Sequence, residues 1–288
     1  MERMNVRRLL HSLVPFLTML LVQRALTLAA DRLSLNGALT ETAIFLLSAA
    51  AGFALLRSGL FAVPEGETPL EVPPLSPETP AVCLLAVPAA VAGMILFGYL
   101  SAALFVGEEG LDLSPLGIVS LLLVHPLVEE YLFRWCIYRN LREMSPIFGC
   151  LAQAVMFALL QNSVAGMIGA LTGGVILAFT VEETGVLGSA VAAHILTKLR
   201  TVLWAGALAE YPEIRRRIDI VLYLAGVAAA AGVLFIRSRR LRRAAESAEA
   251  DEFPDFPEPE ESTEPDESPE SEDESAEPAN VGGGGKKL

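Results

Sequence analysis

The chain is short of cysteine and of positive charge, and each shortage excludes a class of protein. Its three cysteines, among 288 residues, include no Cys-x-x-Cys pair, so neither a disulfide framework nor a thiolate metal site is expected. Residues 244–288 carry sixteen Asp or Glu and two Lys, which leaves the rest of the chain with a net charge of +1. No basic face is therefore available for nucleic acid, and nucleic acid is not expected as a partner.

Hydrophobic residues make up 53% of the chain, and the mean hydropathy is +0.49. Soluble domains are about 45–50% apolar, so this composition indicates a membrane protein. Apolar runs of about 20 residues are long enough to cross a bilayer as helices. We predict an all-α, polytopic membrane helix bundle of about eight transmembrane helices, with seven as the alternative because the fifth run is short. The predicted spans are residues 9–30, 43–63, 81–106, 116–138, 147–161, 164–181, 186–208 and 218–236.

Arginines gather in three clusters near the ends of predicted spans. With eight spans all three fall on one side of the membrane, and the positive-inside rule places that side, with both termini, in the cytoplasm. The Arg215–Arg217 loop then falls outside, against the rule. A cleaved signal peptide is the alternative for the N-terminus, but no small-residue cleavage site follows its apolar core. The clusters are Arg3, Arg7 and Arg8; Arg134, Arg139 and Arg142; and Arg237, Arg239, Arg240, Arg242 and Arg243.

The sequence divides into a transmembrane helical domain, residues 1–243, and an acidic tail, residues 244–288. Residues 64–80 are rich in proline and acid and are expected to form an extended loop between spans. Residues 245–280 are rich in Pro, Glu and Ser and hold too little apolar surface to fold, so a disordered cytoplasmic tail is expected. A solvated appendage and a docking or regulatory segment are both open readings of this tail.

The fourth predicted span carries three charges, and each costs roughly 2.5–3.5 kcal/mol at the centre of a membrane helix. Glu130 and Arg134 are four residues apart, share a face and can neutralise one another. Glu129 lies about 100° round the helix from Glu130. His125 shares the face of Glu129 if Pro126 does not kink the helix between them. These residues form either a site for chemistry or a polar network that holds the bundle together.

Later predicted spans carry further polar residues and a pair of glycines. Gln161 ends the fifth span, where an interhelical hydrogen bond is the simplest role. Gly169 and Gly173 have the spacing that lets membrane helices approach closely. His194 and Lys198 are four residues apart and share a face of the seventh span. A hydrogen-bonded structural histidine, and a lysine that reaches toward the membrane interface, are the alternatives to functional roles.

Three spaced motifs resemble those of the CPBP (Abi, CAAX-protease and bacteriocin-processing) intramembrane protease family, over about residues 116–200. The family patterns are EExxxR, FxxxH and HxxxN or HxxxD. The resemblance implies an intramembrane endopeptidase in which a glutamate activates water to cleave a membrane or lipidated peptide. In this chain the motifs are Glu129-Glu130-x-x-x-Arg134, Phe157-x-x-x-Gln161 and His194-x-x-x-Lys198.

The resemblance implies a role for each matching residue. Glu129 corresponds to the base that activates water, Glu130 and Arg134 to its supporting pair, and His194 to a residue that binds the scissile carbonyl. A divalent metal such as Zn is a candidate cofactor, with Glu129 and His194 as its ligands. His125 is a candidate for supporting Glu129 or for completing such a metal site, which usually needs three protein ligands.

Two residues depart from the family pattern. Gln161 stands where the family has His, and an amide can orient a water but cannot take its proton. Lys198 stands where the family has Asn or Asp. Its charge would weaken a neighbouring carboxylate as a base and repel a divalent metal, although an ammonium stabilises an oxyanion better than an amide does.

These departures leave three functions to weigh. The first is an active endopeptidase, and the second is an inactive pseudoprotease that binds membrane peptides as a scaffold. The third is a transporter, which the sequence does not favour because no broken helices recur at matching positions in two halves. By resemblance the expected location is a prokaryotic plasma membrane, with the lipid bilayer as a partner.

Overall fold

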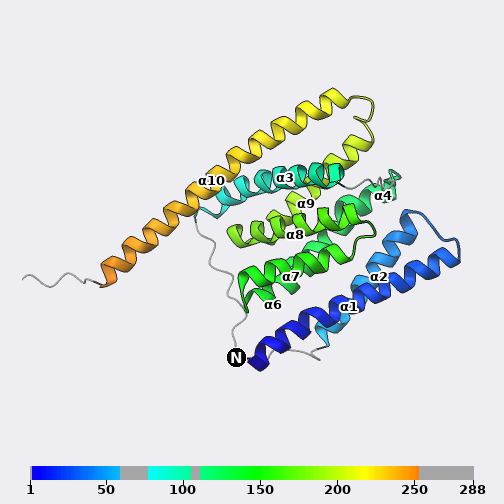
Figure 1. Cartoon of the computed structure of the whole chain (residues 1–288), viewed down its shortest axis with the longest axis horizontal. Helices are drawn as coiled ribbons and strands as arrows, with labels where there is room; N and C mark the ends of the chain where they lie inside the picture. Colours follow the sequence, from blue (N-terminus) through cyan, green and yellow to red (C-terminus); the bar gives the residue numbers. More distant parts are fainter. Residues whose placement is uncertain (1, 59–76, 105–110, 253–288) are drawn as a thin grey trace, which may run out of the picture. The chain divides into compact units, whose positions relative to one another are not determined.

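The computed structural model describes residues 2–58, 77–104 and 111–252, and in these residues the chain forms helices without strands (Figure 1). The predicted all-helical bundle is therefore confirmed. Each of the eight predicted spans has a helix at its position, the fourth being continuous over several segments. The long helices are α1 (Glu2–Arg32), α2 (Ala38–Arg57), α3 (Thr79–Leu104), α7 (Pro146–Leu159), α8 (Val164–Thr184), α9 (Leu187–Ala205) and α10 (Pro212–Glu252).

Six helices are long and apolar enough to cross a membrane: α1, α2, α3, the helix Pro115–Arg142, α8 and α10. Helix α7 is apolar but has only 14 residues, about 21 Å of helix. Helix α9 is less apolar because it carries His194, Lys198 and Arg200. The described surface also exposes many large apolar side chains, such as Leu39, as expected of a protein that meets lipid. The chain is an integral membrane protein.

The helix Pro115–Arg142 alternates between α-helical and π-helical segments. Two π-helical segments, η1 (Ser120–Val124) and η2 (Tyr131–Tyr138), flank α5 (His125–Glu130), and short α-helical segments, α4 (Pro115–Val119) and α6 (Arg139–Arg142), end it. The His125 N–H donates to the carbonyl of Ser120, five residues back. Pro126 has no N–H to donate, so the α-helical pattern is interrupted at this point in any case. Such π-helical turns are common at functional sites.

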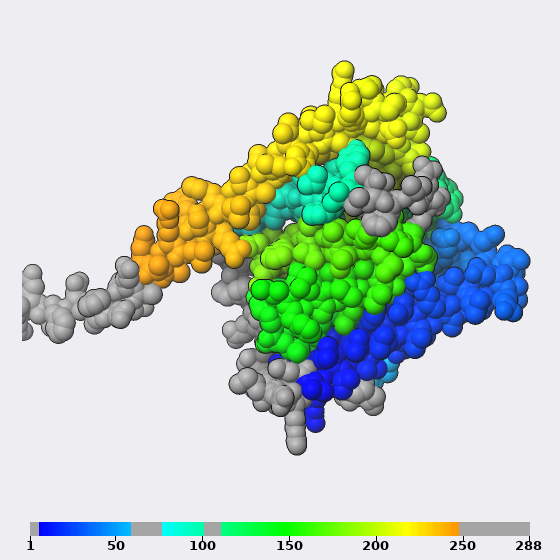
Figure 2. Space-filling model, viewed as in Figure 1, coloured from blue at the N-terminus to red at the C-terminus, as the bar shows by residue number. Residues whose placement is uncertain are grey.

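Helices α1 and α2 form a hairpin, and α7, α8 and α3 lie side by side. A core cluster joins the hairpin to η2 and α7, with Phe16, Phe133 and Phe157 among its members. A second cluster joins α3, α8 and α9 around Leu177 and Ala193. Figure 2 shows the side chains of α7 and α8 filling the space between α1 and α3 on one face.

Close helix approach occurs at other glycines than predicted. A Cβ at Gly169 would meet no atom within 4 Å, and one at Gly173 would lie 3.8 Å from the Met94 sulfur. The prediction that these two glycines bring helices together is therefore wrong. Gly174 does so, because its Cβ would lie 3.0 Å from Cα and Cβ of Ala154. On α10, Gly226 packs in the same way against Ala92.

Members of the three arginine clusters meet at one end of the bundle. The Arg8 carbonyl accepts a hydrogen bond from the side-chain amide of Asn140, on α6, at 2.7 Å. Arg142 and Arg237 pair with the adjacent Glu182 and Glu183 of α8. The common side predicted from sequence is thus a common end of the folded bundle.

The chain divides into two compact units, Met1–Leu241 and Arg242–Leu288, close to the predicted boundary. The tail differs from the prediction in one respect, because α10 continues to Glu252, past the predicted start of disorder. Its Arg-Ala-Ala-Glu composition explains the difference, since these residues favour helix. The later tail and most of the predicted loop 64–80 lie outside the described residues. The three cysteines are free in the structure.

Candidate active site

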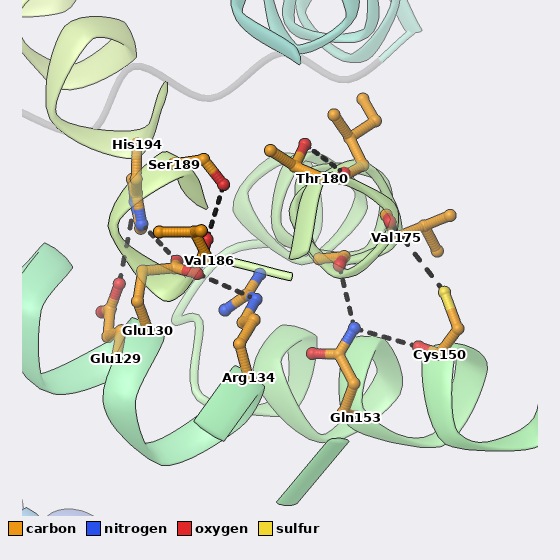
Figure 3. Close-up of polar contacts among 12 residues, drawn as sticks. Glu129, Glu130, Arg134, Cys150, Gln153, Val175, Thr180, Val186, Ser189 and His194 are labelled. Carbon is orange, nitrogen blue, oxygen red and sulfur yellow. Dashed lines mark hydrogen bonds and ion pairs between the residues drawn. The ribbon is translucent and has the colours of Figure 1, made fainter. Parts of the chain in front are cut away.

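Glu129 and Glu130 are neighbours on α5 but face different surroundings. Glu130 points into the protein, where its Oε2 lies 3.1 Å from Arg134 Nε, and neither side chain is exposed. Its other oxygen, Oε1, lies 2.8 Å from Nδ1 of His194 on α9 (Figure 3). Glu130 therefore does more than neutralise Arg134, the role expected from the sequence. It also fixes the imidazole of His194.

The Arg134 guanidinium is buried in an apolar setting. Its carbon lies 4.8 Å from the centre of the Phe157 ring, a cation–π contact. None of its three nitrogens forms a hydrogen bond of good geometry within the described structure. The ion pair with Glu130 and the Phe157 ring thus supply most of its stabilisation. Phe157 also meets His194 edge-on, at 6.2 Å between ring centres, so one aromatic ring touches both members of this network.

Glu129 lies between two histidines. Its Oε1 is 3.5 Å from His125 Nδ1, one turn earlier, and its Oε2 is 3.8 Å from His194 Nε2. The predicted pairing of His125 with Glu129 is therefore present despite Pro126. The His125 ring stacks on Phe45 of α2, at 3.9 Å and 15° between planes, which sets its orientation.

A cavity of about 510 Å³ reaches this carboxylate. Glu129, His194, Gln161 and Lys198 all line it, so one residue or more of each sequence motif faces the same space. Glu130 and Arg134 do not line it and lie behind His194. Part of the wall comes from the α1–α2 hairpin, which contributes Gln23, Glu41, Thr42 and Phe45 among others.

Glycines of α8 form another wall of the cavity. Gly166, Gly169 and Gly173 recur along one face of the helix and line the space opposite the hairpin. Their lack of side chains keeps the cavity open, which replaces the packing role expected from the sequence.

The open wall predicts the effect of Gly169→Leu. A Cβ at Gly169 would meet no atom within 4 Å, the rest of the side chain would occupy the cavity that Gly169 lines, and the helix would gain roughly 1 kcal/mol of propensity. We expect a stable protein whose kcat/KM for a cleaved peptide falls about tenfold or more, since one misfitting apolar group is worth ~1–3 kcal/mol. Gly98→Leu is the control, because Gly98 is equally open but lies away from the cavity. Equal activity of the two variants would show that this cavity does not hold the substrate.

Asp112 holds the N-terminal end of the helix Pro115–Arg142 in place. Its carboxylate accepts hydrogen bonds from the N–H groups of Ser114 at 2.8 Å and Ala38 at 3.1 Å, which join this helix start to α2. Gly117 is required beside it, because a Cβ there would lie 2.4 Å from the Asp112 carbonyl. The Ser114 N–H chiefly lowers the pKa of Asp112. The ionised Asp112 carboxylate therefore stabilises the fold. This stabilisation is present above the pKa of an unfolded aspartate, about 3.9, and is lost as the pH falls through the lower pKa of Asp112 in the folded protein.

The two departures from the family pattern line the cavity without touching Glu129. Within the described residues, Lys198 makes no ion pair, and the Gln161 side chain makes no hydrogen bond. Arg24 of α1 instead donates to the Gln161 carbonyl at 3.0 Å and holds the end of α7. A closed salt bridge between Glu129 and Lys198, which would favour an inactive protein, is therefore not formed in this part of the chain.

The residues do not gather a three-ligand metal site. No group of three His, Cys, Asp or Glu side chains with metal-binding geometry occurs in the ranges that the structure describes. Glu129 lies 3.8 Å from His194 and 3.5 Å from His125, but these three side chains do not form such a group, and Glu130 is already engaged by Arg134. Zinc usually needs three protein ligands, so the geometry does not fit the zinc site considered from the sequence.

Reasoning from the sequence missed two contributions to the site. Phe45 lies outside the motifs, and no signal in the sequence separates it from other core phenylalanines. Phe157 was visible as the first residue of a motif, but its contacts with Arg134 and His194 depend on the fold. The hairpin wall that carries Phe45 also lies outside the motif region.

Comparison with known proteins supports the assignment of this region. Residues 111–200 match the family model described as type II CAAX prenyl endopeptidase Rce1-like. Neither a curated protein nor a solved structure matches the chain. The matched residues include α5, α7, α8 and most of α9, and so every motif residue around the cavity. The resemblance seen in the sequence is thereby supported, since residues 111–200 of this membrane protein are similar to type II CAAX prenyl endopeptidases of the Rce1-like kind.

Proposed function

We propose that the chain is an intramembrane endopeptidase that hydrolyses a membrane-associated or lipidated peptide in the cavity beside Glu129. The observation that carries the proposal is the placement of Glu129 and His194 on the cavity wall, 3.8 Å apart, with Glu130 and Arg134 behind them. The family match supports the reaction class. It does not extend to a particular substrate.

The arrangement of His194 suggests how the site compensates for Gln161. When Nδ1–H of the neutral imidazole donates to Glu130, Nε2 is left as an acceptor that faces the Glu129 carboxylate. Two acceptors 3.8 Å apart do not bond to each other. Their spacing suits a water that donates one hydrogen to each. His194 then assists the base, the role that the resemblance gives to the histidine missing at position 161.

The proposed reaction is direct hydrolysis. The water oxygen attacks the scissile carbonyl carbon while Glu129 takes the proton that the water loses. The resulting tetrahedral intermediate breaks its C–N bond, and the same proton passes from Glu129 to the leaving nitrogen. The products are a carboxyl terminus and an amine. General-base assistance of this kind is worth typically about 10²–10⁴-fold in rate.

We derive no step through a metal, because no group of three side chains with metal-binding geometry occurs in the described residues. A divalent ion held by Glu129 and His194, with His125 in support, remains the alternative. Dialysis against a chelator distinguishes the two. Metal-free hydrolysis predicts that turnover is unchanged after dialysis. Loss of turnover that added Zn restores would show that the reaction needs the metal.

Cleavage by purified protein in liposomes tests the proposal. Palmitoylated and transmembrane peptides are incubated with the native chain and with His194→Gln, and products are identified by mass spectrometry. We expect native cleavage and a loss of about 10²-fold in the variant, since the imidazole acceptor is removed. Equal turnover by the two proteins would show that His194 takes no part in the reaction.

An inactive protein of the same fold, binding membrane peptides as a scaffold, is the second candidate. Gln161 favours it, because this residue lines the cavity where the family has histidine. Gln161→His combined with Lys198→Asn discriminates the two functions. A scaffold predicts cleavage only in the restored variant, whereas native turnover equal to that of the restored variant would exclude the scaffold.

We also propose a prokaryotic plasma membrane with both termini in the cytoplasm. The gathering of Arg8, Arg142 and Arg237 at one end of the bundle supports this orientation through the positive-inside rule. Labelling of a cysteine introduced at Arg216 by an impermeant thiol reagent applied from outside tests it, and protection of that cysteine in intact cells would contradict it.

A further inference from the structure

Lys198 is a cation on the cavity wall that forms no ion pair with the described residues. It is half-buried, and it is the only Lys or Arg lining the cavity in the part of the chain that the structure describes. No carboxylate of those residues lies within ion-pairing distance of its ammonium. Three other half-buried or buried cations of the same unit are in ion pairs: Arg134 with Glu130, Arg142 with Glu182, and Arg200 with Asp219.

Several acceptors of the same cavity wall are already engaged. Asp112 is held by two backbone N–H groups, and Glu129 lies between His125 and His194. The hydroxyl of Thr197 donates to the Ala193 carbonyl at 2.9 Å. Among the described residues of the wall, Lys198 is therefore the one cation whose charge is left for a ligand to neutralise.

A cation is costly in a partly desolvated cavity unless an anion meets it. Lys198 lies one helical turn beyond His194, about 6 Å along the axis of α9. An extended peptide advances ~3.3–3.6 Å per residue, so an anion bound there would lie within a few residues of the bond attacked at Glu129. The position suits a charged group of the substrate better than its reacting carbonyl.

We propose that Lys198 binds a carboxylate of the peptide substrate close to the cleaved bond. This inference rests on the proposed function for the identity of the ligand as a substrate. The carboxylate has two sources of the same chemistry, the free C-terminus of the peptide or an Asp or Glu side chain. The family pattern has Asn or Asp at the position of Lys198, so the preference for a substrate carboxylate is expected of this chain and not of that pattern.

Binding by the full-length Glu129→Gln protein in lipid nanodiscs tests the proposal without requiring cleavage. The probes are palmitoylated Ala/Gly hexapeptides as the free acid, as the C-terminal amide, and as amides carrying one Glu or one Gln, measured near pH 7. We expect a carboxylate to tighten binding about tenfold or more, the range of charge-assisted hydrogen bonds. Lys198→Gln, added to Glu129→Gln, should abolish that difference, and Lys198→Arg should retain most of it.

The outcomes separate the alternatives. Tighter binding of the free acid identifies a C-terminal carboxylate, and tighter binding of the Glu peptide identifies a side chain. Equal affinities for charged and neutral probes would overturn the proposal. So would a Lys198→Gln effect equal on all probes, which would place Lys198 at the reacting carbonyl. Carboxylate-selective binding, together with no cleavage of membrane peptides by the native chain, would refute the protease and leave the Lys198 site intact.

Discussion

Replacing Glu129 by Gln is expected to lower kcat about 10²–10⁴-fold while the protein still inserts and folds. The amide keeps the size of the side chain but cannot take a proton from water. Glu129 lines the cavity and is not part of the Glu130–Arg134 ion pair, so the core contacts of that pair stay in place. Turnover of a membrane peptide, with helix content checked by circular dichroism, measures the effect.

Glu41→Gln is the matched control for that experiment. Glu41 lies on the α2 wall of the same cavity but is exposed, and it lies on a different helix from both His125 and His194. It should leave kcat unchanged. A comparable loss in both variants would mean that cavity charge in general, and not proton transfer at Glu129, controls the rate.

Glu130→Gln is expected to destabilise the fold by about 3–5 kcal/mol, the cost of leaving a buried cation without its partner. Arg134 is fully buried, and its nitrogens have no hydrogen bond of good geometry within the described structure to replace the lost charge. The free energy of unfolding in mixed micelles measures this cost. The same change also frees Nδ1 of His194, so activity should fall with stability.

Glu213→Gln supplies the comparison for the stability measurement. Its ion pair with Arg216 is largely exposed on both sides, and such pairs contribute roughly 0–1 kcal/mol. If the two substitutions lower the free energy of unfolding by the same amount, the ion pair of Glu130 with Arg134 does not stabilise the core as the geometry indicates.

Helical periodicity and apolar runs were sufficient to predict the bundle and the pairing of Glu130 with Arg134. Both follow from local spacing, since residues four apart share a helix face. The contact of Glu130 with His194 was not predictable, because it joins α5 to α9 across a distance in sequence that only packing specifies. Glu130 contacts both Arg134 and His194, whereas Glu129 lines the cavity, so the two adjacent glutamates have different surroundings.

The glycines of α8 show the limit of motif reasoning. The spacing of Gly169 and Gly173 is typical of close helix packing, yet the residue that packs is Gly174, one position round the helix. Rotation of a helix about its axis depends on all its neighbours, and the spacing alone does not set it. The two π-helical segments around α5 likewise have no clear sequence signal apart from Pro126.

The central claim is that Glu129 and His194 act on one water. The most direct test is a double-mutant cycle of Glu129→Gln and His194→Gln on kcat for a cleaved membrane peptide. If both groups serve the same proton transfer, the double variant should be about as slow as the slower single variant. Multiplication of the two single losses would show that the residues act independently and would contradict the account.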